Sequence, residues 1–158
     1  MLDDSGTSSQ QQGSAGFENG EVPFPFRAGA ITVDQPSADM IVNTVRFVFN
    51  AWPETPFIIR IAQNLVKNAD VPRVSQGGLV SASGPELSLK LGWVIDQEQH
   101  SRYAAVMVTD SYPVAPEGPF DPRSEFGQVI SLSDRCGAYA HDRGTWVWAL
   151  VKHGVSTL

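Results

Sequence analysis

The chain has 158 residues, a single cysteine, a formal net charge of −6 and a pI near 4.9. This length is typical of one domain, and such a domain buries roughly 68–70% of its unfolded surface without disulfides or metals. One cysteine excludes an intramolecular disulfide, and the eight arginines and three lysines form no basic run, which argues against a nucleic-acid surface. No apolar run reaches the about 18 residues of a membrane span, and the acidic N-terminus is unlike a secretory leader.

The N-terminal part of the chain changes character after residue 16. Residues 1–16 are mostly Ser, Gln and Gly, so we expect a flexible arm or linker there and a single domain over residues 17–158. Residues 17–27 contain two prolines around a phenylalanine, which predicts an extended edge segment lying over the core. A short strand is expected at residues 29–33.

Two apolar segments on either side of a Pro-rich turn form the centre of the sequence. Residues 41–50 and 57–62 both alternate in polarity, the period of a half-buried strand, and residues 52–56 between them contain two prolines typical of a loop. A helix that begins at Ser37, with Asp39 in its first turn, is the alternative for the first segment. Its β-branched residues and phenylalanines favour the strand.

The clearest alternation in the chain lies in the next part. After a region that is mostly loop, with a weak strand at residues 79–80, leucine, tryptophan and isoleucine occupy every second position of residues 87–95. Residues 103–109 follow as a strand that is apolar on both faces, as expected for a central position in a sheet.

The C-terminal part is predicted to hold a long loop and two more strands. Residues 110–127 contain four prolines and two glycines, a composition typical of an ordered loop with a binding or packing role. Strands are expected at residues 128–132 and 145–152, and a turn-rich crossing at residues 134–144.

Seven or eight short strands, without an alternation of strands and helices, predict an all-β fold. We expect an antiparallel β-sandwich, with the jelly roll and the immunoglobulin-like topology as the main options. The sequence has no Cys-Trp-Cys spacing, which counts against an antibody-type domain, and the long loops favour the jelly roll.

One grouping of residues has the composition of a nucleophilic site. Cys136 lies near His141 and near Asp134 or Asp142, and a catalytic thiolate needs an imidazole and a carboxylate to orient that imidazole. No family signature surrounds the cysteine, and a lone cysteine in a β domain is usually a small buried hydrophobe. We therefore expect no catalytic residues.

Two acidic stretches have oxygen ligands for a hard cation. They are Asp121 with Glu125 in the long loop, and Asp96, Glu98 and His100 in a polar turn. Neither has the spacing of a known calcium loop, and solvated turn residues are the simpler interpretation. The histidines are isolated and are interpreted as titrating surface groups. We expect neither a metal nor a cofactor.

Aromatic residues in loops are the best candidates for contacts with a partner. Trp52 and Tyr112 lie outside the strands, and loop Trp and Tyr are common anchors of interfaces and stacking sites for sugars. Phe120, in the same long loop as Tyr112, is a third candidate. Each ring alternatively closes one end of the sandwich.

These short alternating strands, the Pro-rich loop over residues 112–123 and the polar front arm resemble the β-sandwich coat and protrusion domains of small non-enveloped viruses. The resemblance implies a non-enzymatic structural subunit that lies on the virion surface, assembles with itself and with other coat subunits, and presents loops to a receptor or glycan. Coat proteins that package RNA usually have a basic arm, but residues 1–16 contain no Lys or Arg. The resemblance therefore points to a protruding or spike domain without direct nucleic-acid contact.

Two other functions stay open from the residues alone. The first is a lectin-like, ligand-binding module in which Trp52 or Tyr112 stacks on a ligand and nearby carboxylates accept hydrogen bonds from its hydroxyl groups. The second is a cysteine-dependent hydrolase built on Cys136.

Overall fold

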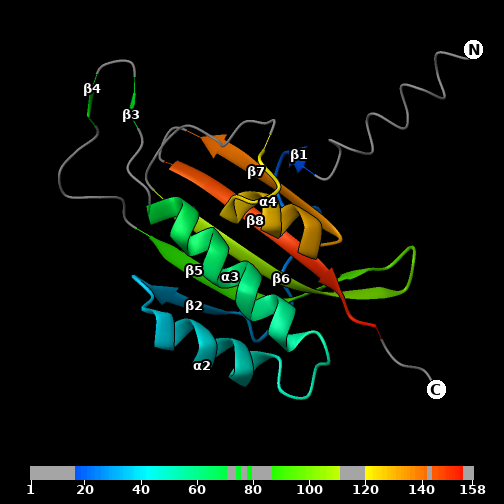
Figure 1. Cartoon of the computed structure of the whole chain (residues 1–158). Coiled ribbons are helices and arrows are strands. Elements are labelled where there is room, and N and C mark those ends of the chain that lie inside the picture. The colour runs from blue at the N-terminus through cyan, green and yellow to red at the C-terminus, as the bar shows by residue number, and fades with distance from the viewer. Residues whose placement is uncertain are drawn as a thin grey trace, which may run out of the picture.

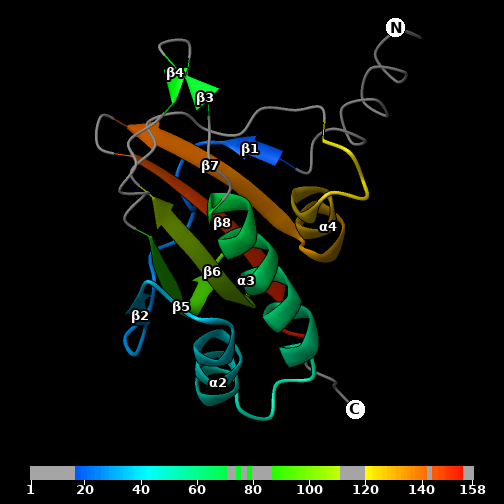
Figure 2. The same ribbon diagram turned by 60° about the vertical axis from the view of Figure 1, so that its left-hand side comes forward.

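A computed structural model describes residues 17–70, 74–75, 78–79, 87–110, 120–141 and 144–154. Within these residues the protein has two layers, a six-stranded sheet and three helices that cover one face of it (Figures 1 and 2). The predicted all-β antiparallel sandwich is therefore wrong, because the second layer is helical and the sheet includes a parallel pair. Both the jelly roll and the immunoglobulin-like topology need two packed sheets. The predicted flexible arm lies outside the described residues.

The strands are, in chain order, β1 (Phe17–Asn19), β2 (Ile31–Asp34), β3 (Val74–Ser75), β4 (Gly78–Leu79), β5 (Ser88–Asp96), β6 (Ser101–Asp110), β7 (Arg135–His141) and β8 (Gly144–Lys152). Six of them form one sheet in the order β1-β7-β8-β6-β5-β2, and β3 pairs with β4 separately. β1 runs parallel to β7, and the other neighbours in the large sheet are antiparallel. The strands predicted near β2, β5, β6 and β8 are confirmed, as is the central place of β6.

The first predicted central strand is helix α2 (Ala38–Val48), which the alternative interpretation had placed at the same start. The Ser37 side chain accepts a hydrogen bond from the backbone N–H of Met40 and so caps the helix. The negative charge of Asp39 in the first turn interacts favourably with the positive end of the helix dipole. The residues that reach the core, Ile41 and Val45, are four positions apart on one helical face. Their β-branched side chains did not prevent the helix, because burial outweighs a propensity difference of less than about 1 kcal/mol per residue.

The second predicted central strand is part of helix α3 (Thr55–Asp70). Its fully buried residues follow helical spacing for about three turns: Ile58, Ile61, Ala62, Leu65 and Ala69. This is the i, i+3, i+4, i+7 pattern of a helix with one buried face. The 57–62 window was too short to separate this pattern from alternation.

Two further predictions are wrong near the C-terminus. The strand expected at residues 128–132 belongs to helix α4 (Glu125–Leu132), which is capped by Ser124 through a hydrogen bond from the backbone N–H of Gly127. The turn-rich crossing expected at residues 134–144 contains strand β7, which pairs with β8 over its whole length. The order in this region is therefore helix then strand.

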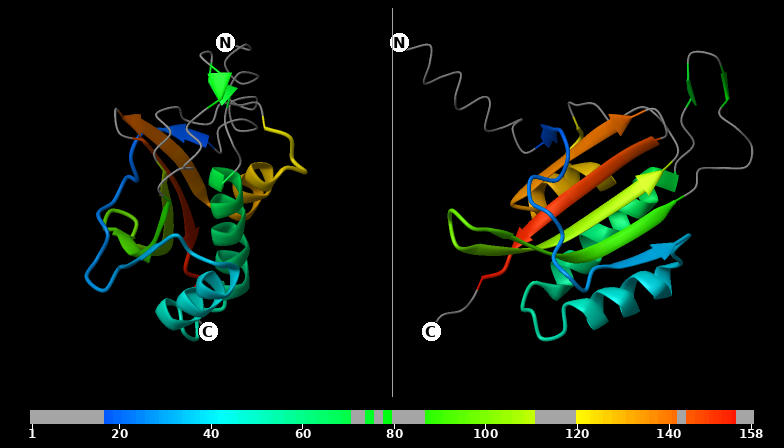
Figure 3. Two further views of the ribbon diagram at one scale, coloured as in Figure 1. Left: turned by 90° about the vertical axis from the view of Figure 1, so that its left-hand side faces the viewer. Right: turned by 180° about the vertical axis from the view of Figure 1, so that it is seen from behind.

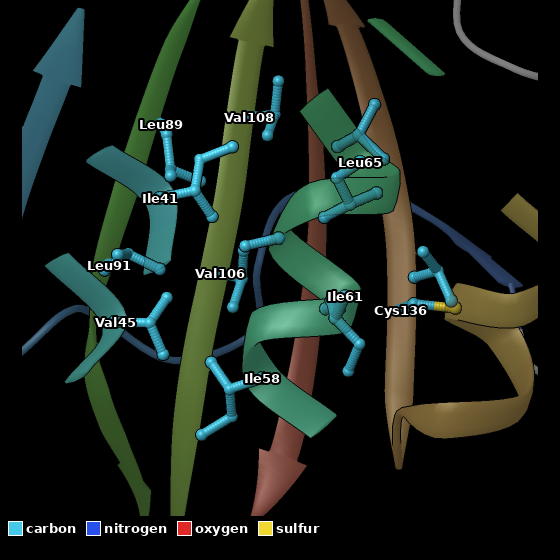
Figure 4. Packing of buried hydrophobic residues seen from close by; sticks show 14 of the residues in the cluster. Ile41, Val45, Ile58, Ile61, Leu65, Leu89, Leu91, Val106, Val108 and Cys136 are labelled. Atoms are coloured by element: carbon cyan, nitrogen blue, oxygen red, sulfur yellow. The ribbon is translucent and has the colours of Figure 1, made fainter. Parts of the chain in front are cut away.

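The main core lies between the helices and the sheet (Figure 4). Ile41 and Val45 of α2 face Leu89 and Leu91 of β5, and α3 covers β6 and β8 at the centre of the sheet (Figures 2 and 4). These side chains are at most 3% exposed. Full burial of each contributes about 1.5–3 kcal/mol, so this layer is the main source of stability.

The outer face of the sheet, which points away from the helices, has its own cover. Residues 20–30, here named the strap, cross this face between β1 and β2 (Figure 3). Val22, Phe24 and Phe26 of the strap pack against a second buried cluster that includes Trp148. The Trp148 indole N–H donates to the Gly20 carbonyl at 2.8 Å, which ties the strap to β8. The predicted extended segment over the core is therefore confirmed.

Candidate functional site

The β5–β6 hairpin extends beyond the layer of helices, so its helix-side face is uncovered near the turn (Figures 1 and 3). At this end of the sheet lies an open depression of about 860 Å³, here named the hairpin pocket. It is lined by residues of the hairpin and of the end of β8: Ile95, Gln99, His100, Ser101, Arg102, Lys152, His153 and Gly154.

The pairing of the strands places Ile95, Arg102 and His153 in one row across the sheet. Ile95 is opposite Arg102 in the β5–β6 ladder, and Tyr103 is opposite Lys152 in the β6–β8 ladder. The His153 backbone N–H donates to the Arg102 carbonyl at 2.8 Å, which extends the second ladder by one pair. Directly opposite residues have Cβ atoms about 4.5–5.5 Å apart on the same face, so the Arg102 and His153 side chains are neighbours.

Strand alternation puts this row on the helix side of the sheet. Ala104 and Val151 are paired with each other in the β6–β8 ladder, and both belong to the helix-side core. Arg102 and His153 are each two positions from these residues and therefore point to the same side. Lys152 alternates to the outer face, so it lines the pocket from the other side of β8.

His153 is held by a carboxylate and by an aromatic ring. Its Nδ1 lies 3.0 Å from Oε1 of Glu54, and its ring is stacked on Trp52 with the centroids 3.9 Å apart. Oε2 of Glu54 accepts a hydrogen bond from the backbone N–H of Gly154 at 2.8 Å. The Glu54 and His153 side chains are 14% and 19% exposed. The imidazole therefore has a defined orientation, with Nδ1 engaged and Nε2 on the opposite edge of the ring.

Glu54 is a carboxylate in a partly buried position. Burial by itself would raise the pKa of the Glu54 carboxyl, but the hydrogen bonds from His153 and Gly154 outweigh it and hold that pKa below its usual value. Glu54 is therefore a stable anion behind His153 at neutral pH.

The loop between α2 and α3 positions Trp52 and Glu54. The Phe49 carbonyl accepts hydrogen bonds from the Trp52 backbone N–H and from the Thr55 hydroxyl, at 3.0 and 2.8 Å. The fully buried Phe49 ring also meets Trp52 edge to face. Ala51 has a φ of 67°, the left-handed conformation that turns the chain between the helices. The loop is thus anchored to the core at the point where it supports His153.

Arg102 has an aromatic support but no acidic partner among the described residues. Its guanidinium carbon lies 4.6 Å from the centroid of the Trp93 ring. Two other cations have acidic partners: Arg135 makes two hydrogen bonds at 2.8 Å to Glu18, and Lys67 lies 3.9 Å from Glu125. In a chain with a net charge of −6, the hairpin pocket therefore has an unneutralised positive charge.

The turn of the hairpin contributes two acidic residues and a histidine. Asp96 Oδ1 accepts hydrogen bonds from the backbone N–H groups of Glu98 and Gln99, which closes the turn. His100 has a φ of 53°, the left-handed conformation that ends it. Asp96 and Glu98 line a neighbouring depression together with Arg135, whereas His100 lines the hairpin pocket. The acidic residues of the turn therefore line a different depression from Arg102 and His153.

A carboxylate that orients an imidazole is also part of many hydrolytic sites, but such a site needs a nucleophile at the imidazole. Ser101 is the hydroxyl of the hairpin pocket, and its Oγ donates to the Gln99 carbonyl at 3.3 Å. No hydrogen bond joins Ser101 to His153 in the described part of the chain. The arrangement of charges favours the binding of an anion over acyl transfer.

The structure brings one of the three aromatic candidates to this site. Trp52 supports His153, as described above, rather than standing free for a ligand. Phe120 belongs to an edge-to-face cluster with Phe17 and Phe126, with centroids 5.2 and 4.6 Å away. Tyr112 lies outside the described residues. A direct contact of any of the three with a partner stays a prediction.

The nucleophile candidate is not assembled. Cys136 is buried and points into the helix-side core (Figure 4), and burial raises the pKa of its thiol to about 11. His141 is five residues further along β7, about 17 Å away at 3.3 Å per residue. Asp134 accepts a hydrogen bond from the Lys152 backbone N–H, and Asp142 lies outside the described residues. Cys136 is therefore a core residue here.

The acidic stretches have structural roles. Asp121 Oδ1 accepts a hydrogen bond from the Arg123 backbone N–H in the turn before α4, and Glu125 pairs with Lys67. Asp96 closes the hairpin turn. Among the residues that the structure describes, no group of three or more His, Cys, Asp or Glu is placed to hold a metal ion.

Sequence analysis missed Glu54, Arg102 and His153 as a group. They are 48 to 99 positions apart in pairs. The register of β6 with β8 joins Arg102 to His153, and the contact with Nδ1 joins Glu54 to His153. One sequence signal points to His153: it is a polar residue two positions after Val151, the last apolar residue of β8. Such a residue occurs too often at strand ends to single out a site.

No protein family, curated protein or solved structure shows a significant match to this chain. None of the described helices is long and apolar enough to cross a membrane, in agreement with the predicted absence of a span.

Proposed function

We propose that the protein is a binding module that takes a small anion in the hairpin pocket. The observation that carries the proposal is the pair of Arg102 and His153, which lie side by side in a pocket without a carboxylate facing them. Glu54 contacts His153 only through Nδ1, on the side of the helix loop. Of the functions open from the sequence, this is closest to the ligand-binding module.

The support of the two side chains favours binding over a solvated surface. Trp93 lies under the Arg102 guanidinium, and Trp52 under the His153 ring. A side chain that is already ordered loses less conformational entropy when a ligand binds. An arginine fork also matches two oxygens of an anion at once.

The test is the binding of a panel of anions to the wild type and to Arg102→Ala, measured by calorimetry at low salt. We expect Arg102→Ala to weaken the binding of the best anion at least tenfold, since a hydrogen bond between charged groups contributes about 1.5–3 kcal/mol. Arg123→Ala is the matched control. Arg123 is exposed and is two positions before Glu125, which pairs with Lys67 of α3. Lys67 is 12 residues, or about 18 Å, along α3 from Thr55, the residue that follows Glu54. Equal losses in both variants would mean that general charge, not the pocket, attracts the anion.

Self-association is a second candidate, proposed from the viral resemblance and from exposed apolar side chains of the helical layer. Phe47 of α2 is 76% exposed and Phe57 of α3 is 51% exposed. Exposed large hydrophobic side chains that gather in a patch often mark an interface. Light scattering with size exclusion tests this proposal: we expect an oligomer that Phe47→Ser weakens, and a monomer at high concentration would contradict it.

A further inference from the structure

We propose that the anion of the hairpin pocket is a phosphate monoester group, held by the Arg102 guanidinium and by Nε2 of His153. This inference rests on the proposed binding of anions and names the chemical class of the ligand. Its basis is the combination of donor directions, charge and support at this end of the sheet.

The two donors come from different strands and have different shapes. Arg102 presents the edge of a planar guanidinium whose face lies on Trp93. His153 presents a single ring nitrogen, because Nδ1 is engaged by Glu54. A planar carboxylate is satisfied by one arginine fork, which would leave the imidazole without a partner. A phosphate monoester has three terminal oxygens in a tetrahedral arrangement, so two can meet the guanidinium while the third meets the imidazole.

The charges also suit a doubly charged group. Arg102 is always protonated, so its attraction for a ligand grows with the negative charge of that ligand. A phosphate monoester has a charge between −1.5 and −2 near pH 7. Such a ligand is therefore attracted more strongly than a single carboxylate or a sulfate ester, each of which has one negative charge. Lys152 lines the pocket from the other side of β8, and its positive charge adds to this attraction.

Glu54 acts as a positioning residue in this arrangement. Oε1 engages the His153 ring and Oε2 engages the Gly154 backbone N–H, so the carboxylate joins the ring to the end of β8. Trp52 restricts the ring from one face. The His153 ring, and with it Nε2, is thus already ordered at the end of β8, so a ligand that binds it does not have to order it.

The experiment compares four probes by calorimetry: methyl phosphate, methyl sulfate, acetate and succinate, at constant ionic strength. Methyl sulfate keeps the tetrahedral shape with one charge, and succinate keeps two charges without the shape. We expect methyl phosphate to bind at least tenfold more tightly than each of the others. Tighter or equal binding of succinate or acetate, lost in Arg102→Ala, would overturn the phosphate inference and leave the proposed function standing. Binding of none of the four would overturn both.

Variants assign the contacts. We expect Arg102→Lys to recover part of the affinity that Arg102→Ala loses, since it keeps the charge without the fork. His153→Asn should weaken methyl phosphate at least fivefold and acetate less than twofold, and an equal effect on both would overturn the role of Nε2. Glu54→Gln should weaken methyl phosphate about as His153→Asn does. Circular dichroism and thermal unfolding confirm that each variant is folded, and because Arg102 is exposed, its variants keep the inference testable if the others unfold.

One further experiment distinguishes two sources of the phosphate group, a small phosphate ester and a phosphorylated protein segment. A phosphoserine peptide and its unphosphorylated form are titrated beside methyl phosphate. Affinity of the phosphopeptide equal to that of methyl phosphate assigns the site to small phosphate esters, and a tighter phosphopeptide assigns it to a phosphorylated protein segment. Equal binding of both peptides would show that phosphate is not recognised and would overturn the inference.

Discussion

Replacement of Glu54 by Gln tests the carboxylate that orients His153. The change keeps the size of the side chain and removes the charge that accepts hydrogen bonds from the His153 ring and from the Gly154 backbone. Hydrogen bonds to a charged group contribute about 1.5–3 kcal/mol and neutral ones about 1 kcal/mol. The two side chains are 14% and 19% exposed, so solvent weakens these interactions only in part. We expect Glu54→Gln to lower the free energy of unfolding by about 1–2 kcal/mol at pH 6.

The pH dependence of this loss follows from the direction of the Glu54 pKa. That pKa is lower in the folded protein than its usual value of 4.5, so the contribution of Glu54 is complete above that value and is lost as the pH falls through the folded pKa. Urea unfolding followed by circular dichroism from pH 3 to 7 should therefore show a difference between wild type and variant that shrinks below about pH 4.5. Glu125→Gln, in an exposed pair, is the control and should change stability by less than about 0.5 kcal/mol. A variant as stable as the wild type at pH 6, or a difference that persists in acid, would refute the orienting role.

Three further predictions concern the elements around the site. Gly127→Ala should lower the free energy of unfolding by about 1–3 kcal/mol despite the better helix propensity of Ala, because a Cβ there would meet the Asp121 carbonyl and lie 2.8 Å from Pro122 Cα; a more stable variant in urea unfolding would contradict this packing. Ala51→Gly should raise stability by about 0.5 kcal/mol and increase the Tm, since glycine removes the cost of the left-handed backbone, and a lower Tm would speak against that conformation. Cys136 should resist alkylation at pH 8 until urea unfolds the chain, because its thiol is buried and its pKa is about 11; rapid labelling of the native protein would place it at the surface.

Long strands were the part of the fold that sequence patterns predicted. In β5, a polar or small residue separates each pair of leucines, so alternation was visible over nine residues. β6 has small and apolar residues on both faces, because it is covered by α3 on one side and by the strap on the other. In these segments burial and local preference agree.

Helices rich in β-branched residues were the part that sequence patterns mispredicted. In α3, Phe57, Ile59 and Ile61 alternate over a short window, but Phe57 is 51% exposed and Ile61 is fully buried. The helical period appears only when the window extends to Leu65 and Ala69. Because strand patterns were assigned to parts of all three helices, the sequence predicted a second sheet where the helical layer lies.

The site was predictable only in part. Trp52 was identified because a tryptophan in a Pro-rich loop needs a role, and the structure gives it one beside His153. The pairing of Arg102 with His153 depends on β8 joining β6 across α4 and β7, and no local pattern encodes such a register. The nucleophile hypothesis on Cys136 depended on closeness in sequence, which a strand turns into about 17 Å of separation.

The path of residues 17–34 has a consequence for how the chain folds. This single segment supplies one edge strand, crosses the outer face and then supplies the opposite edge strand, so it closes both sides of the sheet. Synthesis produces β1 before β7, the strand that it pairs with, which lies more than a hundred residues later. Closure of so long a loop slows folding, and until then the edges of β5 and β7 are open to pairing with other chains. Aggregation should therefore compete with refolding most strongly before this segment docks on the sheet.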